Sequence, residues 1–187
     1  MKFKSLLIFP LLVPHLQAAT VEDLTFALNG DGTEYSVSNC LTSASDSLDI
    51  PSTYNGLPVT SIGCVAFSRC YSLSSITIPD GVTSIGYNAF NNTGIYFSED
   101  TNSIKYLFSD SVNTAYLIDG SSSSGNMIVP NTFFGASVTL IGGGAFSGCS
   151  SLTSITIPDS VTSIGKRAFA RNQILNSITI PDSAVSY

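Results

Sequence analysis

The stretch SSLTSITIPDSVTSIGKRAF, Ser150 to Phe169, decides the fold, because YSLSSITIPDGVTSIGYNAF, Tyr71 to Phe90, is nearly the same sequence. Repetition at a fixed period is typical of a stacked solenoid, in which each copy covers the apolar face of its neighbour. The Ile-Pro or Val-Pro mark of the repeat has five copies, with prolines at Pro51, Pro79, Pro130, Pro158 and Pro181.

The spacing of these prolines defines the repeat unit. The shortest step, from Pro158 to Pro181, is the basic unit, and the steps from Pro51 to Pro79 and from Pro130 to Pro158 contain five extra residues after the proline. The step from Pro79 to Pro130 equals one short and one long step together, so it holds an insertion at about residues 95–125. Within it, IKYLF and AYLID are joined by SDSVNT, and their alternation around a polar turn predicts a β-hairpin.

Each copy predicts one short strand in SITIP and a second in VTSIG. Alternation turns Ile76 and Ile78 inward and Ser75 and Thr77 outward. The segment around Ala89-Phe90 is long enough only for a helical turn. Because phenylalanine recurs at one place in every coil, we expect a stacked core column. Its members are Phe67, Phe90, Phe146 and Phe169.

The pattern L-x-x-I-x-I-P-x-x-V-T-x-I-G-x-x-A-F, written by Leu152 to Phe169, resembles the BspA-like class of bacterial leucine-rich repeats. The resemblance covers about Leu48 to Asp182. It implies a right-handed coil with parallel strands on one face, and a surface or secreted protein that binds other macromolecules. We therefore expect an α/β repeat solenoid of about five rungs at residues 47–187. LTFALNGDGTEYSVSNC predicts a hairpin cap before it, at residues 20–46.

The first nineteen residues predict a secretory signal, since Lys2 and Lys4 precede an apolar run broken by prolines and followed by QAAT. Its removal takes away His15, the only histidine, and two of the seven basic residues, while the thirteen acidic residues stay. The mature net charge is then 5 − 13 = −8, which disfavours a nucleic-acid or anionic-membrane partner. We expect an exported protein in the periplasm, at the cell surface or outside the cell, without a transmembrane segment.

Catalytic groups are scarce in the mature sequence, so we predict neither an enzyme nor a cofactor or metal site. Without histidine there is no Ser-His-Asp or Cys-His pair, and the cysteines lack C-x-x-C spacing. The adjacent acids Glu99 and Asp100 fit solvated charges better than an acid–base pair. Gly142-Gly143-Gly144 lacks the lysine that would mark a phosphate-binding loop.

The four cysteines divide by their phase in the coil. Cys70 and Cys149 each follow a core phenylalanine by three residues, where leucine-rich repeats place an inward polar group that satisfies the turn. We expect them to be buried free thiols. Cys64 has a variable, exposed phase, and a Cys40–Cys64 disulfide that ties the cap to the first coil stays open.

Two surfaces are candidates for contact with a partner. The outward strand positions carry Thr77, Thr156 and Thr179 on a flat, weakly polar face, which fits a binding role and an unspecialised repeat face equally well. The insertion is richer in rings. They are Tyr96, Phe97, Tyr106, Phe108 and Tyr116.

The favoured function is a non-catalytic module for protein binding or adhesion, whose partner is a protein or a surface glycan. The alternative is a structural spacer or fragment of a longer array with no dedicated ligand. That alternative rests on the end PDSAVSY, which lacks a polar cap and leaves a sheet edge for end-to-end self-association.

Overall fold

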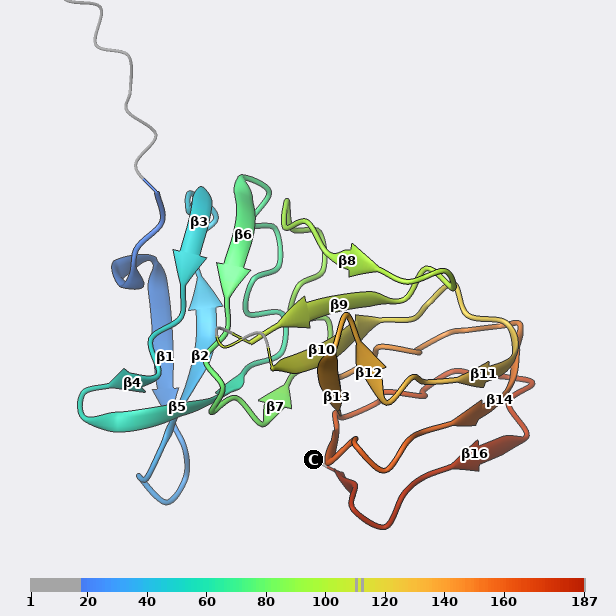
Figure 1. Cartoon of the computed structure of the whole chain (residues 1–187). Helices are drawn as coiled ribbons and strands as arrows, with labels where there is room; N and C mark the ends of the chain where they lie inside the picture. Colours follow the sequence, from blue (N-terminus) through green and yellow to red (C-terminus); the bar gives the residue numbers. More distant parts are fainter. Residues whose placement is uncertain (1–17, 110, 112, 187) are drawn as a thin grey trace, which may run out of the picture.

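The computed structural model describes residues 18–109, 111 and 113–186 (Figure 1). Almost all regular structure in these residues is strand, and the only helix among them is one 3-10 turn. In chain order the elements are η1 (Val21–Asp23), β1 (Leu24–Leu28), β2 (Tyr35–Cys40), β3 (Asp46–Asp49), β4 (Thr53–Tyr54), β5 (Leu57–Ile62), β6 (Leu73–Thr77), β7 (Ser84–Ile85), β8 (Ser98–Glu99), β9 (Lys105–Phe108), β10 (Thr114–Asp119), β11 (Gly125–Ile128), β12 (Thr132–Phe133), β13 (Ala136–Ile141), β14 (Leu152–Thr156), β15 (Ser163–Ile164), β16 (Ser177–Thr179) and β17 (Val185–Ser186).

The predicted solenoid is confirmed, but it is built from strands and turns alone. Around Ala89 and Phe90, where the sequence predicts a helical turn, the chain makes a tight turn in which Ala89 N–H donates to Gly86 O at 3.2 Å. So short a segment cannot sustain a helix, and the backbone groups of this turn also bond to the preceding coil. Ala89 O, for example, accepts from Phe67 N–H at 2.8 Å.

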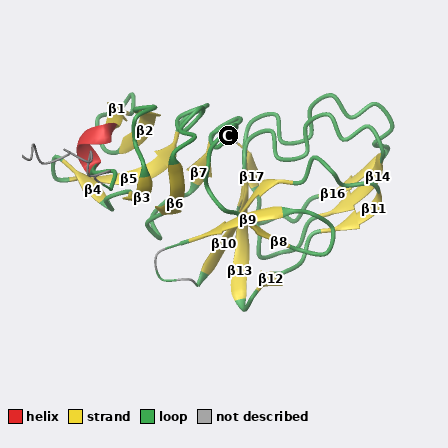
Figure 2. Cartoon of the chain, turned by 90° about the horizontal axis from the view of Figure 1, so that it is seen from above, coloured by secondary structure: helices red, strands yellow, loops and turns green. Residues whose placement is uncertain are grey.

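Parallel strands form two columns along the coil. The VTSIG-type strands pair as β2–β5–β7 and as β10–β13–β15–β17. The SITIP-type strands pair as β3–β6 and as β11–β14–β16. The first column is therefore interrupted between β7 and β10, and the second between β6 and β11. Figures 1 and 2 show β3 and β6 at one end of the molecule and β11, β14 and β16 at the other.

The two halves of the chain repeat each other at a constant offset. The strands β3, β5, β6 and β7 begin at residues 46, 57, 73 and 84, and β11, β13, β14 and β15 begin at 125, 136, 152 and 163. Left-handed turn residues obey the same offset: φ is 61° at Asp46 and 63° at Gly125, and 49° at both Asn55 and Phe134. We call residues 24–97 unit 1 and residues 105–186 unit 2.

Each unit begins with an antiparallel hairpin that continues into the parallel ladder. β1 pairs with β2 in unit 1, and β9 pairs with β10 in unit 2. The range predicted to be an inserted hairpin, residues 95–125, thus contains a hairpin whose second strand is also a rung beside β13. In each unit, one stacked pair of aromatic rings packs the hairpin against the following coil. The pairs are Phe26–Tyr54, with centroids 4.0 Å apart, and Tyr106–Phe133, at 4.1 Å.

Two hydrophobic clusters fill the interior, and they do not divide at the boundary between the units. One cluster contains the core of unit 1 together with Leu107, Tyr116 and Leu140 from unit 2. The other contains the rest of the unit 2 core, including Phe146 and Leu152. The three residues from unit 2 thus cover the open end of unit 1.

Candidate binding site at the junction of the two units

Strand β13 joins the units because its end bonds to two neighbours. Gly142 N–H donates to Leu117 O of β10 at 2.8 Å, and the next residue, Gly143, donates to Ile85 O of β7, also at 2.8 Å. A Cβ on Gly143 would lie 2.5 Å from the backbone nitrogen of Tyr87, so only glycine permits this approach. The triple glycine, Gly142 to Gly144, therefore allows β7, β10 and the end of β13 to approach one another closely.

Side chains on the junction face of unit 2 are larger and more apolar than their equivalents in unit 1. Tyr116 pairs with Leu140 across β10 and β13, where unit 1 pairs Ser36 with Ser61 across β2 and β5. Tyr116 and Leu140 are buried against unit 1, and Tyr116 O–H donates to Pro79 O at 3.5 Å. The serines of unit 1 are half-buried, and no earlier unit lies against them among the described residues.

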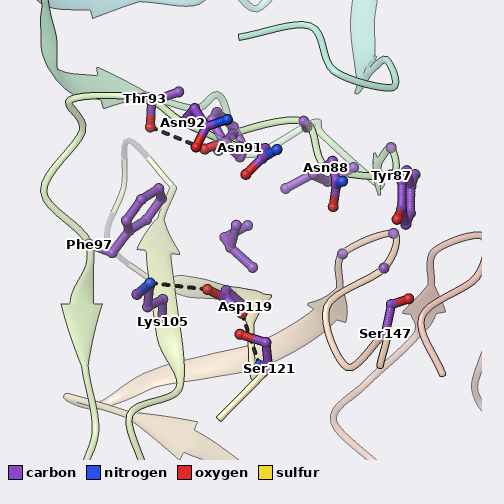
Figure 3. Close-up of a pocket in the computed structure, with 18 of the residues that line it drawn as sticks. Tyr87, Asn88, Asn91, Asn92, Thr93, Phe97, Lys105, Asp119, Ser121 and Ser147 are labelled. Atoms are coloured by element: carbon purple, nitrogen blue, oxygen red, sulfur yellow. Dashed lines mark hydrogen bonds and ion pairs between the residues drawn. The ribbon is translucent and has the colours of Figure 1, made fainter. Parts of the chain in front are cut away.

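A hollow of about 550 Å³ lies on one side of the junction (Figure 3). Its unit 1 wall is a polar turn, and its unit 2 wall carries an ion pair in which Lys105 Nζ lies 3.1 Å from Asp119 Oδ2. The polar residues that line it include Asn88, Asn91, Asn92, Thr93, Ser121 and Ser147.

The Asp119 carboxylate is held in its charged form. Burial opposes ionisation, but hydrogen bonds from the backbone and side chain of Ser121 and the nearby Lys105 ammonium outweigh it, so the pKa of Asp119 lies below its ordinary value. Ser121 N–H donates to Asp119 Oδ1 at 2.9 Å. A charged acid paired with lysine can orient a polar ligand, but it makes a poor proton acceptor at neutral pH.

A second, smaller hollow of about 290 Å³ forms a groove between β6 and β9. One wall is Ser75 to Thr77 of β6, and the other is Tyr106 to Ser109 of β9 and its following turn. Tyr96 stands beside the groove with 87% of its surface exposed. We call this hollow the β6–β9 groove.

The rings predicted to contact a partner divide into two groups. Tyr96 is exposed and Phe108 is half-buried, and both line the β6–β9 groove, while half-buried Phe97 lines the larger hollow. For Tyr106 and Tyr116 the prediction is wrong, because their exposed fractions are 0% and 1%. Tyr106 packs on Phe133 and Tyr116 on unit 1, which leaves neither ring to a partner.

The predicted threonine face is split into two. Thr77 lies in the sheet of β3 and β6, opposite Asp49, and it lines the β6–β9 groove. Thr156 and Thr179 pair with each other in the sheet of β11, β14 and β16, and both are exposed. A ligand large enough to need one continuous face would therefore meet only part of it.

The predicted phenylalanine column consists of two stacked pairs. Phe67 and Phe90 have centroids 5.3 Å apart, and Phe146 and Phe169 have centroids 5.5 Å apart. The junction separates the pairs, because Phe90 meets Phe97 at 6.4 Å rather than Phe146. The first three members of the column are buried, and Phe169 is half-buried.

The thiols of Cys70 and Cys149 are free, buried and turned inward. Cys149 Sγ lies 3.4 Å from Gly120 O and Cys70 Sγ lies 3.6 Å from Leu41 O, so each thiol donates to a turn of the preceding coil. At the same phase Asn172 donates to Phe146 O at 2.9 Å. These three coils thus each place a donor here.

Cys40 and Cys64 are not joined in the structure. Cys40 is buried at the end of β2, whereas Cys64 is exposed on the turn after β5. The thiol beside Cys40 is that of Cys70.

One candidate for partner contact, Phe134, is missing from the sequence-based predictions. It lies in the turn between β12 and β13 with 81% of its surface exposed and φ of 49°, which is unusual for a bulky residue. In unit 1 the same turn is Asn55-Gly56, a pair suited to left-handed conformations. Alignment of the two units at their constant offset identifies the exchange.

Within the described residues, no three histidine, cysteine, aspartate or glutamate side chains gather as a metal site would require. A helix long and apolar enough to cross a membrane is likewise not found there. The predicted signal segment, residues 1–19, lies outside the described residues except for Ala18 and Ala19.

Comparison with known proteins identifies the repeat. The model of the BspA type leucine rich repeat region matches residues 34–117 and 125–187 in six copies, one more than the five rungs expected. No curated protein matches the chain.

Three similar solved structures are a leucine rich repeat protein, a leucine rich cell surface protein and a vaccine antigen. A leucine rich repeat protein of T. pallidum is 20% identical with a TM-score of 0.45, and the alignment covers 91% of this chain and 85% of that one. A leucine rich cell surface protein of Faecalibacterium prausnitzii A2-165 is 28% identical with a TM-score of 0.39, over 88% and 48% of the two chains. The pneumococcal vaccine antigen PcpA is 13% identical with a TM-score of 0.40, over 90% and 56%.

The family match covers well over half of the 187 residues and includes both units. The chain belongs to the BspA-type leucine-rich repeat family.

Proposed function

We propose that the protein is an exported, non-catalytic recognition or adhesion module that binds an extended segment of a partner protein in the β6–β9 groove. One observation carries the proposal: the groove brings an exposed tyrosine, Tyr96, beside half-buried Phe108 and the edge of a short sheet. Aromatic rings next to a hollow contribute disproportionately to binding energy.

The edge of β6 favours a protein partner over a glycan. Among the described strands β6 pairs only with β3. Its other edge is met at Ser74, whose carbonyl accepts from Tyr96 N–H at 3.1 Å, and at Ile78, which forms an isolated bridge with Ser109. Between these two points Ile76 lines the groove, where an added peptide strand would find backbone groups to pair with.

Export and surface location rest on the signal segment and on a likeness. Lys2, Lys4 and the apolar run after them have the pattern of a secretory signal. One similar structure is a leucine rich cell surface protein. The sequence supports a non-catalytic role, because its one histidine, His15, lies within the predicted signal.

Point variants suit the test better than removal of residues 95–125, because that deletion would also take away the rung β10. The purified protein, Tyr96→Ser and Tyr71→Ser would each be screened against a phage-displayed random peptide library and a glycan array. Tyr71 is a matched control, since it is 65% exposed and lines neither hollow.

We expect peptides that bind the wild type and Tyr71→Ser but not Tyr96→Ser. Equal binding to all three proteins would place the contact elsewhere, and glycan binding without peptide binding would reject a protein partner. If no probe of either kind binds the folded protein, the spacer function becomes the better account.

The spacer function has one specific observation in its favour. β16 is the outer strand of its sheet among the described residues, and it exposes Ile178 at 39% with Ile180 beyond it at 51%. Such an edge could pair end to end with another repeat. Sedimentation of the wild type beside Ile178→Lys tests this, since a monomer at every concentration contradicts self-association.

A further inference from the structure

We infer that Cys40 and Cys70 form a disulfide when the protein folds in an oxidising compartment, and that this bond ties the N-terminal hairpin to the first coil. The inference concerns covalent structure and is independent of the β6–β9 groove. It replaces the Cys40–Cys64 pairing left open by the sequence.

The two thiols already lie together in the core. Cys40 is 2% exposed and Cys70 is 0% exposed. Cys70 Sγ lies 3.8 Å from Cys40 O, and Cys40 Sγ and Cys70 Sγ each lie 3.6 Å from the same carbonyl oxygen, Leu41 O. A disulfide needs the sulfur atoms to close to about 2 Å, which a small side-chain rotation achieves from contact.

Comparison with unit 2 shows that the coil itself brings these positions together. There Cys149 donates to Gly120 O, and Gly120 corresponds to Cys40 because each donates its N–H, at 2.7 Å, to the matching alanine of the next coil, Ala145 or Ala66. The inward thiol thus bonds to the turn without a second cysteine.

The second cysteine is a feature of unit 1 alone. A Cβ at Gly120 would overlap the ring of Phe146, so unit 2 has no room for one. Unit 1 admits the Cys40 side chain and directs it to the thiol of Cys70.

The bond forms by thiol–disulfide exchange. A small disulfide such as oxidised glutathione accepts two electrons: one protein thiolate attacks it and releases one glutathione thiol, and the second protein thiolate then displaces the other. The products are one protein disulfide and two glutathione thiols, so atoms and electrons balance.

Burial makes the order of events matter. Burial is the main cause that raises the pKa of the Cys40 thiol and of the Cys70 thiol, so little thiolate is present in the folded protein. We therefore expect the bond to form during folding, and the folded reduced protein to be oxidised much more slowly.

The experiment is a peptide map of the full chain refolded in a glutathione redox buffer. The protein is denatured, alkylated without reductant, digested and analysed by mass spectrometry, with a reduced sample alongside. We expect two alkylated cysteines, Cys64 and Cys149, and one linked peptide pair that contains Cys40 and Cys70. The linkage should survive in Cys64→Ser and Cys149→Ser.

Two outcomes overturn the inference: alkylation of all four cysteines in the oxidised sample, or a linked pair that joins Cys40 to Cys64. The peptide map of the wild type alone tests the inference, even if Cys40→Ser and Cys70→Ser fold poorly. Where both fold, each should lose the rise in Tm that the wild type shows on oxidation.

Discussion

Substitution of Gly143 by alanine tests how the units are joined. The new Cβ would lie 2.5 Å from Tyr87 N and 2.7 Å from Gly86 C, both backbone atoms that cannot turn aside. The coils must separate by roughly 0.5–1 Å, a form of overpacking that costs about 1–3 kcal/mol. Separation also stretches two junction hydrogen bonds, Gly143 N–H to Ile85 O and Asn88 N–H to Gly143 O, each worth about 1 kcal/mol.

We therefore expect Gly143→Ala to lower the free energy of unfolding by about 2–4 kcal/mol, a large part of the roughly 5–15 kcal/mol typical of folded domains. The measurement is urea unfolding followed by circular dichroism. The matched control is Cys64→Ala, because Cys64 has the same position in unit 1, where it is exposed and free. Its effect should stay within about 0.5 kcal/mol.

A Gly143→Ala protein as stable as the wild type would refute the close contact between β13 and β7. A loss of the same size in Cys64→Ala would show that the position, rather than the junction, is sensitive.

Three further substitutions each test another feature of the molecule. Leu140→Ser should destabilise the fold by about 3 kcal/mol or more, since it removes a buried side chain that covers unit 1, and unchanged urea unfolding would contradict this. Asp119→Asn should lower stability at pH 7. The difference in stability from the wild type should shrink as pH falls through 3.8, the ordinary pKa of an aspartate, and then through the lower pKa of folded Asp119, because protonation of Asp119 also ends its pairing with Lys105. A stability difference independent of pH would argue against this role of the Asp119 charge. Phe134→Asn should raise stability by about 1 kcal/mol in thermal unfolding, as Asn55 forms the same turn in unit 1, and a loss of stability would mean that the exposed ring supports the fold.

The repeat marks predict the coil because they determine burial directly. Isoleucine at alternate strand positions and phenylalanine before each turn are large apolar side chains that favour the interior. Phe67 and Phe146 are accordingly buried in the core. The offset between the units is also present in the prolines, since the step from Pro51 to Pro130 equals the step from Pro79 to Pro158. The sequence suggests an insertion instead, because the hairpin of unit 2 carries no Ile-Pro mark.

The site is harder to predict, because it arises where two units meet. Alternation places Tyr106 and Leu107 on opposite faces of β9, but it cannot tell that unit 1 covers one face and Phe133 the other. The same limit applies to Gly143, whose role depends on Ile85, a neighbour from the other unit. Sequence spacing likewise leaves Cys64 as a possible partner for Cys40, whereas the turn of the coil places the Cys70 thiol beside Cys40.

The close correspondence of strands and turns between the units has a consequence for growth of the protein. A gene segment that encodes one complete hairpin and its coils can be copied in frame, and the copy needs only a few larger side chains on its leading face to dock on its predecessor. Each such event leaves the existing interior closed and creates one new crevice with its own lining. Lengthening the chain would therefore multiply recognition sites that diverge separately, while the scaffold between them stays the same.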